Sequence, residues 1–383
     1  MRPMKEHPIL DPNDGITLFY PHIPKNAKKY INDTLSGRWI GQGPKVDLFE
    51  KNIQSKLKIK ATPVAVSSGT AALHIAYILS GIKPGDDVLC PIFTCTATNI
   101  PLLYLNANLI FLDISNDNLN INIADLESKI TNKTVALSIV DYGGLPNNYE
   151  QIRKFCDKYK IKLIADCAHA IDGKYNGKHI SEYADYTIFS FQAIKTLSTG
   201  DGGMLLLKNE KEREIARRLR WFGIDRSAKQ KGIWENDLNE IGFKYQMNDI
   251  SASIGLAALD ELGDILSKRR KLYDLYIENL DEYANYLLEK KRDQSDFTPW
   301  LLTLDTRGKR IGLMNFLRIK GIETGQVHYR NDKYSIFTKF IKGTYPNMDK
   351  MEDNYLVLPL HTKMNDKDVI KICFEVKSFL DAN

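Results

Sequence analysis

The chain has 383 residues, of which 43% are hydrophobic and 26% charged, with 24 glycines and 14 prolines. This composition is typical of a globular protein of about two domains and excludes collagen-like, low-complexity and largely disordered classes. The formal net charge is +5, and no basic run is long enough for a nucleic-acid arm. We therefore expect a small anionic ligand and no nucleic-acid partner.

A membrane-bound or secreted protein is not expected from this sequence. No segment approaches the roughly 20 apolar residues of a membrane span, and the first residues lack a signal-peptide pattern. A cytoplasmic location is the expectation. The five cysteines are scattered, at Cys90, Cys95, Cys156, Cys167 and Cys373. Because a structural zinc site needs four convergent ligands, we expect no metal.

Short apolar runs alternate with amphipathic segments between about residues 60 and 207. In chain order, the expected strands and helices are Pro63–Ser67, Thr70–Leu79, Asp87–Cys90, Ala97–Leu103, Leu109–Ile114, Ile123–Ile130, Thr134–Val140, Tyr149–Tyr159 and Ile161–Ala165. The alternation predicts an α/β fold with a mostly parallel sheet and helices on both faces. Two further runs, Tyr186–Phe191 and Gly203–Leu207, have no helix between them, so the sheet should be mixed.

The remaining segments indicate a second, smaller domain. They are a helix at Glu210–Trp221, a polar loop at Asp225–Asn239, helical spacing over Met247–Leu288, a strand at Trp300–Thr303, and helices at Ile311–Lys320 and Val369–Leu380. We therefore divide the chain into a large domain, residues 1–260 with the N-terminal segment, and a small C-terminal α+β domain, residues 261–383.

A phosphate-binding turn is predicted where the first apolar strand meets its helix. The run Ser67–Leu73 follows the strand and opens the helix, which places backbone N–H groups and the positive end of the helix dipole at Gly69 and Thr70. Gly69 permits close approach of an anion, and the Thr70 hydroxyl can donate to it. Alternatively, the same residues form only an N-cap, and they match neither a Walker loop nor a dinucleotide pattern.

Asp166 ends the buried run Ile161–Ala165, and His169 follows three residues later. The carboxyl ends of parallel strands face the ligand crevice. A carboxylate there needs a cation, for which a protonated pyridine nitrogen is suited. The alternatives are an Asp166 that caps the next turn and a His169 that is hydrogen-bonded near the surface.

Lys195 is isolated among apolar and small residues, shortly after Ser190 at the end of an apolar run. Partial burial lowers the pKa of a lysine and makes its amine available to bond a carbonyl carbon. A lone lysine is usually only a solvated side chain. The combination with the phosphate turn and with Asp166, however, is the layout that a pyridoxal phosphate site requires.

Over nearly its whole length the sequence resembles the DegT/StrS-type aminotransferases, pyridoxal-phosphate-dependent enzymes best known for aminating nucleotide-linked keto sugars. The resemblance rests on Gly37–Pro44 with Phe49-Glu50, Ser68–Thr70, Pro91–Asn99, Asp166–Ala170, Ser190–Lys195 with Gly200–Gly203, Gly242–Asp249 and Leu358–His361. It implies the fold type I of pyridoxal-phosphate-dependent transferases, which is aspartate aminotransferase-like.

The resemblance also implies roles for the matched residues. Lys195 would bond the cofactor, pyridoxal 5'-phosphate, and move a proton during the reaction, while Asp166 would keep the pyridine nitrogen protonated. Further cofactor contacts would be Gly69, Thr70, Cys95, His169, Ser190 and Lys244. Lys244 stands where the family often has an Asn that reaches the phosphate from the neighbouring subunit, which implies a homodimer with shared active sites.

Two matched regions are less well defined. Cys95 stands where many members have an aromatic residue that stacks on the cofactor ring, and Phe93 is the alternative for that contact. The substrate mouth is expected at Trp39, Arg226, His328 and Arg330. The two arginines are candidates for a diphosphate because the guanidinium fork matches phosphate oxygens; otherwise they are surface arginines, and Trp39 is a core residue.

The implied reaction moves an amino group, with glutamate as the expected donor, to a nucleoside-diphosphate-linked keto sugar in amino-sugar or surface-polysaccharide biosynthesis. Retention of Lys195 favours amino transfer over the family's dehydratases, in which histidine replaces that lysine. Two alternatives remain: a transaminase of an inositol ketone or keto-alcohol phosphate, and a non-catalytic regulator that binds the cofactor. No helix-turn-helix pattern supports the regulator.

Overall fold

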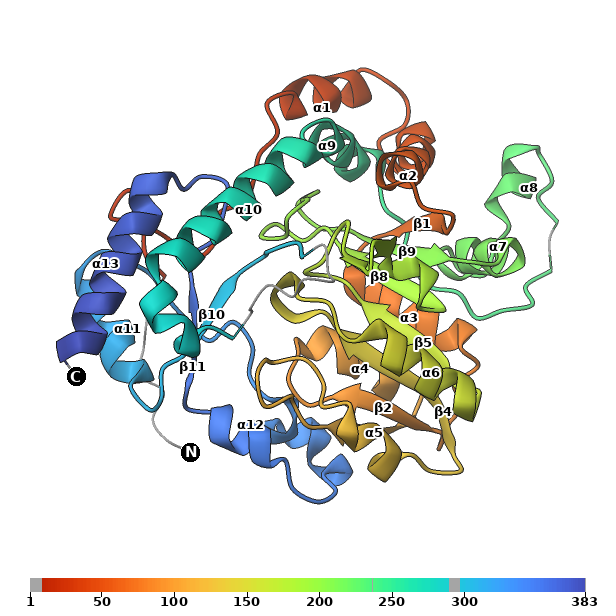
Figure 1. Cartoon of the computed structure of the whole chain (residues 1–383). Coiled ribbons are helices and arrows are strands. Elements are labelled where there is room, and N and C mark those ends of the chain that lie inside the picture. The colour runs from red at the N-terminus through yellow and green to blue at the C-terminus, as the bar shows by residue number, and fades with distance from the viewer. Residues whose placement is uncertain (1–8, 236, 289–296, 383) are drawn as a thin grey trace.

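A seven-stranded sheet forms the centre of the computed structural model, which describes residues 9–235, 237–288 and 297–382 (Figure 1). Its strands are β1 (Thr62–Val66), β2 (Asp87–Pro91), β3 (Asn108–Leu112), β4 (Thr134–Val140), β5 (Lys162–Asp166), β8 (Tyr186–Ser190) and β9 (Gly203–Leu207). They are arranged in the order β1-β9-β8-β5-β4-β2-β3. Only β9 pairs antiparallel, with both β1 and β8. The predicted mixed, mostly parallel sheet is confirmed.

Both faces of this sheet are buried under helices. Val64 and Val66 of β1 pack into one hydrophobic cluster, and Ala65 between them packs into the cluster on the opposite face, because successive side chains of a strand alternate. The first face is covered by α3 (Gly69–Leu79), α4 (Thr96–Tyr104) and α7 (Glu210–Leu219). The second is covered by α2 (Pro44–Leu57), α5 (Ala124–Lys129), α6 (Tyr149–Tyr159) and α9 (Asp249–Asp260). Burial on both faces explains why the strands read as continuous apolar runs.

A second core lies around the antiparallel pair β10 (Leu302–Asp305) and β11 (Tyr355–Leu358). The helices α11 (Arg310–Ile319) and α13 (Asp366–Ala382) pack there, together with the later turns of α10 (Leu262–Asn279) (Figure 1). The first turns of α10 belong instead to the large-sheet cluster, through Leu262 and Leu266. Helix α10 thus spans both cores, and the division of the chain at residue 260 stays a proposal.

Several elements differ from the sequence-based expectation. The helical spacing over Met247–Leu288 is divided into α9 and α10, which meet at Glu261. The expected loop Asp225–Asn239 contains a short helix, α8 (Arg226–Gln230), because the Asp225 side chain accepts the N–H of Ala228 and caps it. Elements that the sequence did not indicate are α1 (Ala27–Leu35), α2, α12 (Pro346–Met351), β11 and the small hairpin β6 (Lys174–Tyr175) and β7 (Lys178–His179). Within the described residues, no helix is both long enough and apolar enough to cross a membrane.

Helix α2 is capped from a distant part of the chain. The fully buried carboxylate of Asp249, at the start of α9, accepts the backbone N–H groups of Gly43, Lys45 and Val46 at 2.7, 3.1 and 3.2 Å. The N-cap of α2, Gly43, has no side chain to do so. The carboxylate therefore satisfies the free donors at this helix end and complements its dipole.

Replacing Asp249 with alanine should lower the free energy of unfolding by about 2–4 kcal/mol, because three backbone donors lose a charged acceptor. Urea unfolding would measure the change. The matched control is Asp264→Ala, an exposed carboxylate in the first turn of α10, which should cost about 0.5 kcal/mol or less. Equal effects of the two substitutions would contradict the capping role.

Candidate active site

The ends of four neighbouring strands meet at one edge of the large sheet. In the register of the sheet, Gly203 at the start of β9 pairs with Val66 at the end of β1 and with Ser190 at the end of β8. Asp166 ends β5, the next strand along. The antiparallel direction of β9 is what brings its first residue to the edge where its neighbours end. This edge therefore collects side chains that are far apart in sequence.

The turn after β1 forms a cup lined by backbone. Ser68 is the N-cap of α3, and its hydroxyl accepts the N–H of Ala71, so Gly69 and Thr70 carry the first N–H groups of the helix. A Cβ on Gly69 would lie 3.0 Å from the Cβ of Ser190, and one on Gly203 would overlap the backbone of Ser68. Two glycines thus allow the close packing of the cup, which suits an anion.

Asp166 is a buried carboxylate beside the cup, with 4% of its surface exposed. One oxygen accepts the hydroxyl of Thr98 at 2.8 Å, and the other accepts the N–H of Ala168 at 3.1 Å. Burial raises its pKa, while these hydrogen bonds and the positive charge of Lys195 oppose the rise. Among the described residues no cation lies within ion-pair distance of it. The carboxylate is therefore suited to a cationic ligand atom.

Lys195 lies in the loop that connects β8 to β9. Its Nζ is 3.8 Å from the ring centroid of Trp300. Burial lowers its pKa to about 8, although the charge of Asp166 works in the opposite direction. The amine is consequently easier to deprotonate than that of an ordinary lysine, which is what a nucleophilic lysine requires.

A stack of four rings flanks Lys195. His169 stacks on Trp300 at 3.9 Å and on His328 at 5.4 Å between centroids, and Phe19 stacks on the same tryptophan at 5.3 Å. Burial, with the nearby charge of Lys195, lowers the pKa of His169 well below its usual value and that of His328 to about 3. Both imidazoles are therefore neutral at physiological pH.

Sequence reasoning missed Trp300 as a site residue. Its indole N–H donates to the carbonyl of Ile194 at 2.9 Å, next to Lys195, although the two segments are 106 residues apart in sequence. No local pattern marks this tryptophan, which we expected only in a strand; the observed β10 starts two residues later. The contact arises because the segment that precedes β10 packs against the lysine loop.

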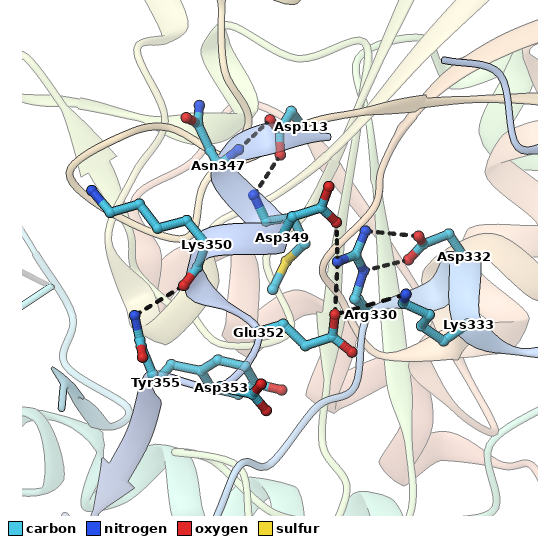
Figure 2. A network of polar contacts seen from close by, with 12 residues as sticks. Asp113, Arg330, Asp332, Lys333, Asn347, Asp349, Lys350, Glu352, Asp353 and Tyr355 are labelled. Atoms are coloured by element: carbon cyan, nitrogen blue, oxygen red, sulfur yellow. Dashed lines mark hydrogen bonds and ion pairs between the residues drawn. The ribbon is translucent and has the colours of Figure 1, made fainter. Parts of the chain in front are cut away.

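Arg330 does not lie free for a diphosphate, in contrast to the sequence-based expectation. Its side chain is 2% exposed. The guanidinium binds Asp332 through two hydrogen bonds of 2.8 Å and also contacts Asp349 at 2.6 Å and Glu352 at 2.9 Å (Figure 2). Three carboxylates already use its donors, so we correct its assignment from a substrate contact to a structural ion-pair centre.

Phe93, the alternative to Cys95 for the stacking contact, is not available for it. Cys95 is exposed and forms the N-cap of α4. Phe93 is fully buried and packs against Tyr142 and Tyr355, at 5.2 and 4.9 Å between ring centroids. A side chain without accessible surface cannot stack on a ligand ring, so Phe93 does not replace the aromatic residue.

Trp39 and Arg226 line a separate cavity of about 260 Å³, together with Trp221 and Arg217. Arg226 donates to the carbonyl of Gln42, and its guanidinium lies 5.7 Å from the Trp221 ring centroid. Among the described residues Arg226 forms no ion pair with a carboxylate, whereas Arg217 lies 3.8 Å from Asp47. Two indoles and an arginine without a carboxylate partner suit a planar, anionic ligand.

Lys244 is exposed, and its backbone forms an isolated antiparallel β-bridge with Trp221. Its Nζ is 5.3 Å from the ring centroid of Phe222, and no contact to Gly69, Thr70 or Ser190 within this chain is found in the described residues. The structure therefore brings together Lys195, Asp166, His169 and His328, and places Lys244, Trp39 and Arg226 elsewhere on the chain.

Comparison with known proteins connects this arrangement to sugar-modifying enzymes. The sequence profile of the DegT/DnrJ/EryC1/StrS aminotransferase family matches residues 21–377. GDP-perosamine synthase of Escherichia coli O157:H7 is 31% identical, over 95% of this chain and 98% of its own. The UDP-4-amino-4,6-dideoxy-N-acetyl-beta-L-altrosamine transaminase of Campylobacter jejuni is 30% identical, over 92% and 94%. Spr1654 of Streptococcus pneumoniae, solved in PMP and PLP forms, has TM-scores of 0.89 and 0.88 at 26% identity, over 95% of this chain and 98% of that chain.

These likenesses confirm the predicted transferase fold type I and the predicted cofactor, pyridoxal phosphate. The residues of this chain fit that group. The backbone cup at Gly69 and Thr70 suits its phosphate, and the buried carboxylate of Asp166, which lacks a cationic partner in the described chain, suits a protonated ring nitrogen. Lys195, with its lowered pKa, has an amine suited to the aldehyde.

In the cofactor-free protein, Lys195 should react with an amine-selective acylating reagent with a pH midpoint near 8 instead of the ordinary lysine value of about 10.4. The neutral amine is the reactive form, so labelling should rise as the pH increases through that midpoint. Mass spectrometry of the peptide that carries Lys195 would follow it, with peptides of exposed lysines as internal controls. A midpoint above 10 would refute the effect of burial.

Proposed function

Because the chain belongs to the DegT/DnrJ/EryC1/StrS aminotransferase family, we propose that it transfers an amino group from glutamate to a keto sugar linked to a nucleoside diphosphate. The observation that carries this proposal is the convergence of Lys195, Asp166 and the Gly69 cup at one edge of the sheet. The product would be an amino sugar for a surface polysaccharide or a related glycosylated product.

Each site residue has a distinct task in this proposal. When bound, pyridoxal phosphate supplies an electron sink for the carbon that loses its proton. The Asp166 carboxylate holds a proton on the ring nitrogen, which keeps the ring electron-poor. The Lys195 amine takes the proton from the substrate carbon and returns it, for which a pKa near 8 is well matched. The N–H groups at Gly69 and Thr70 and the Ser190 hydroxyl bind the phosphate and fix its position.

The sugar part of the proposal is supported by the relatives and by the second cavity. Two relatives are named for sugars linked to GDP and to UDP. The cavity lined by Trp39, Trp221 and Arg226 offers ring faces and a guanidinium without a carboxylate partner. Those groups suit the base and the diphosphate of a nucleotide, whereas a small ketone without a nucleotide needs neither.

A homodimer with shared active sites is part of the same proposal. Phe222, which lies beside Lys244, is exposed, and so are four apolar side chains of the segment that precedes Lys244 in the sequence. They are Ile233, Trp234, Leu238 and Ile241, and all five are 44% to 86% exposed. Large exposed apolar groups close together mark interaction surfaces. A second copy of the chain that covers them would also bring Lys244 to a neighbouring phosphate cup. The cytoplasmic location stays a prediction from the sequence.

Purified protein loaded with pyridoxal phosphate should lose its visible absorption when glutamate is added, as the amino group moves to the cofactor. A panel of nucleotide-linked keto sugars, inositol ketones and keto-alcohol phosphates should then restore the absorption only with the first class. Lys195→Ala is the control, because it should show neither change. Restoration only by ketones without a nucleotide would overturn the proposed substrate class.

Arg226→Ala should raise the KM for the nucleotide-linked sugar about 10-fold or more, which corresponds to the loss of a charge-assisted hydrogen bond of about 1.4 kcal/mol or more. The rate of the glutamate half-reaction should stay unchanged, because glutamate carries no diphosphate. Steady-state kinetics and stopped-flow absorption separate the two effects. The matched control is Arg213→Ala, an arginine of α7 paired with Glu210 at the surface. Equal KM values for Arg226→Ala and the control would argue against the nucleotide cavity.

A further inference from the structure

The turn that connects β2 to α4 is held by a residue from far along the chain, Asn331. This side chain is fully buried. Its backbone N–H donates to the carbonyl of Ile92 at 2.7 Å, its Nδ2 donates to the carbonyl of Thr94 at 2.8 Å, and its Oδ1 accepts the Nδ2 of Asn99 at 2.9 Å. One asparagine thus binds two positions of the turn and one residue in the first turns of α4.

The turn and the start of α4 carry two hydroxyl groups that are linked to Asp166. Thr98 Oγ1 lies 2.8 Å from a carboxylate oxygen of Asp166 and 2.7 Å from Thr94 Oγ1. Because an ionised carboxylate only accepts, Thr98 must donate to Asp166, and its oxygen is then free to accept the hydroxyl proton of Thr94. Both threonines are buried, so no solvent competes for these hydrogen bonds.

Asn331 is itself fixed by its neighbours in the chain. Arg330 and Asp332, on either side of it, are joined by two hydrogen bonds, and Arg330 is also held by Asp349 and Glu352 near α12 (Figure 2). Because three carboxylates bind the Arg330 guanidinium, the neighbouring residue Asn331 has little conformational freedom. The ion-pair centre therefore restrains the backbone on both sides of Asn331.

We propose that Asn331 is a positioning residue for amino transfer: by holding Thr94 and Asn99 it directs the Thr98 hydroxyl onto Asp166 and so supports the charged carboxylate that faces the ring nitrogen. The inference rests on the role of Asp166 in the proposed function. Asn331 contacts neither substrate nor cofactor in this scheme and acts only through the turn.

The test uses the pH at which the visible absorption of the protein-bound cofactor changes. If the negative charge of Asp166 is less well supported, the ring nitrogen of the cofactor carries less positive charge. That charge then repels less strongly the proton on the nitrogen that joins Lys195 to the cofactor. This proton is therefore lost at a higher pH, and the midpoint should rise. We expect a rise of about 1 pH unit for Thr98→Val and about 0.5 for Asn331→Ala. In the Thr98→Val background, Asn331→Ala should produce no further rise, because its route to Asp166 has been removed.

A general loss of stability is separated from positioning by a matched control. Asn347 also donates its Nδ2 to a backbone carbonyl, that of Ile114 at 2.8 Å, and within the described residues its side chain makes no hydrogen bond to Asn331, Thr94 or Thr98. Asn347→Ala should lower the melting temperature without moving the midpoint. Three results would overturn the proposal. The first is a midpoint unchanged in Asn331→Ala, and the second is an equal change in Asn347→Ala. The third is a further rise when Asn331→Ala is added to Thr98→Val. If Asn331→Ala folds poorly, Thr94→Val, which keeps the side-chain size, must give the same rise.

A second readout keeps the inference separate from the proposed function. In the cofactor-free protein, hydrogen exchange of the amides in residues 92–99 should accelerate at least 10-fold in Asn331→Ala and stay unchanged in Asn347→Ala. If added pyridoxal phosphate gives no visible band in the unaltered chain, the proposed function fails. The exchange result then decides alone whether Asn331 holds the turn, and unchanged exchange contradicts it.

Discussion

The buried carboxylate of Asp166 is the constraint on which the rest of this site depends. An ionised carboxylate in a protein interior is costly unless hydrogen bonds and a cation compensate for lost hydration. The chain supplies a hydroxyl from Thr98 and an N–H from Ala168. The cationic partner is left to the ligand. This arrangement suits a protonated ring nitrogen, the partner that we propose for Asp166.

The phosphate end follows a different principle, since backbone instead of side chains forms it. Sheet register places Gly203 between the turn after β1 and Ser190, and the helix α3 begins at the same point. Any Cβ at Gly69 or Gly203 would press on these neighbours. In the proposed site, the cup of N–H groups binds the phosphate at one end of the cofactor and the buried carboxylate binds the ring nitrogen at the other.

Residues from the C-terminal third of the chain complete the site by contacts that cross long stretches of sequence. Trp300 holds the lysine loop through Ile194, and Asn331 holds the turn after β2. One expectation about the residue next to Asn331 was wrong. Arg330, which we expected to bind a diphosphate, is instead bound by three carboxylates of its own chain. Charge patterns in a sequence do not tell an arginine that binds a ligand from one that binds its own chain.

The sequence alone predicted the α/β architecture, the mixed sheet and a pyridoxal phosphate site, because apolar periodicity and strand-end polar residues are local properties. Asp166, Lys195 and Gly69 were identified in this way. The family followed from the resemblance of its motifs to those of known aminotransferases. Only the tertiary structure decided what surrounds them: the Trp300 contact to Lys195, the Asn331 turn and the Asp249 cap of α2. These contacts depend on which distant segments pack together. A hydrogen bond between residues that are far apart in the chain produces no periodic pattern in the sequence from which it could be predicted.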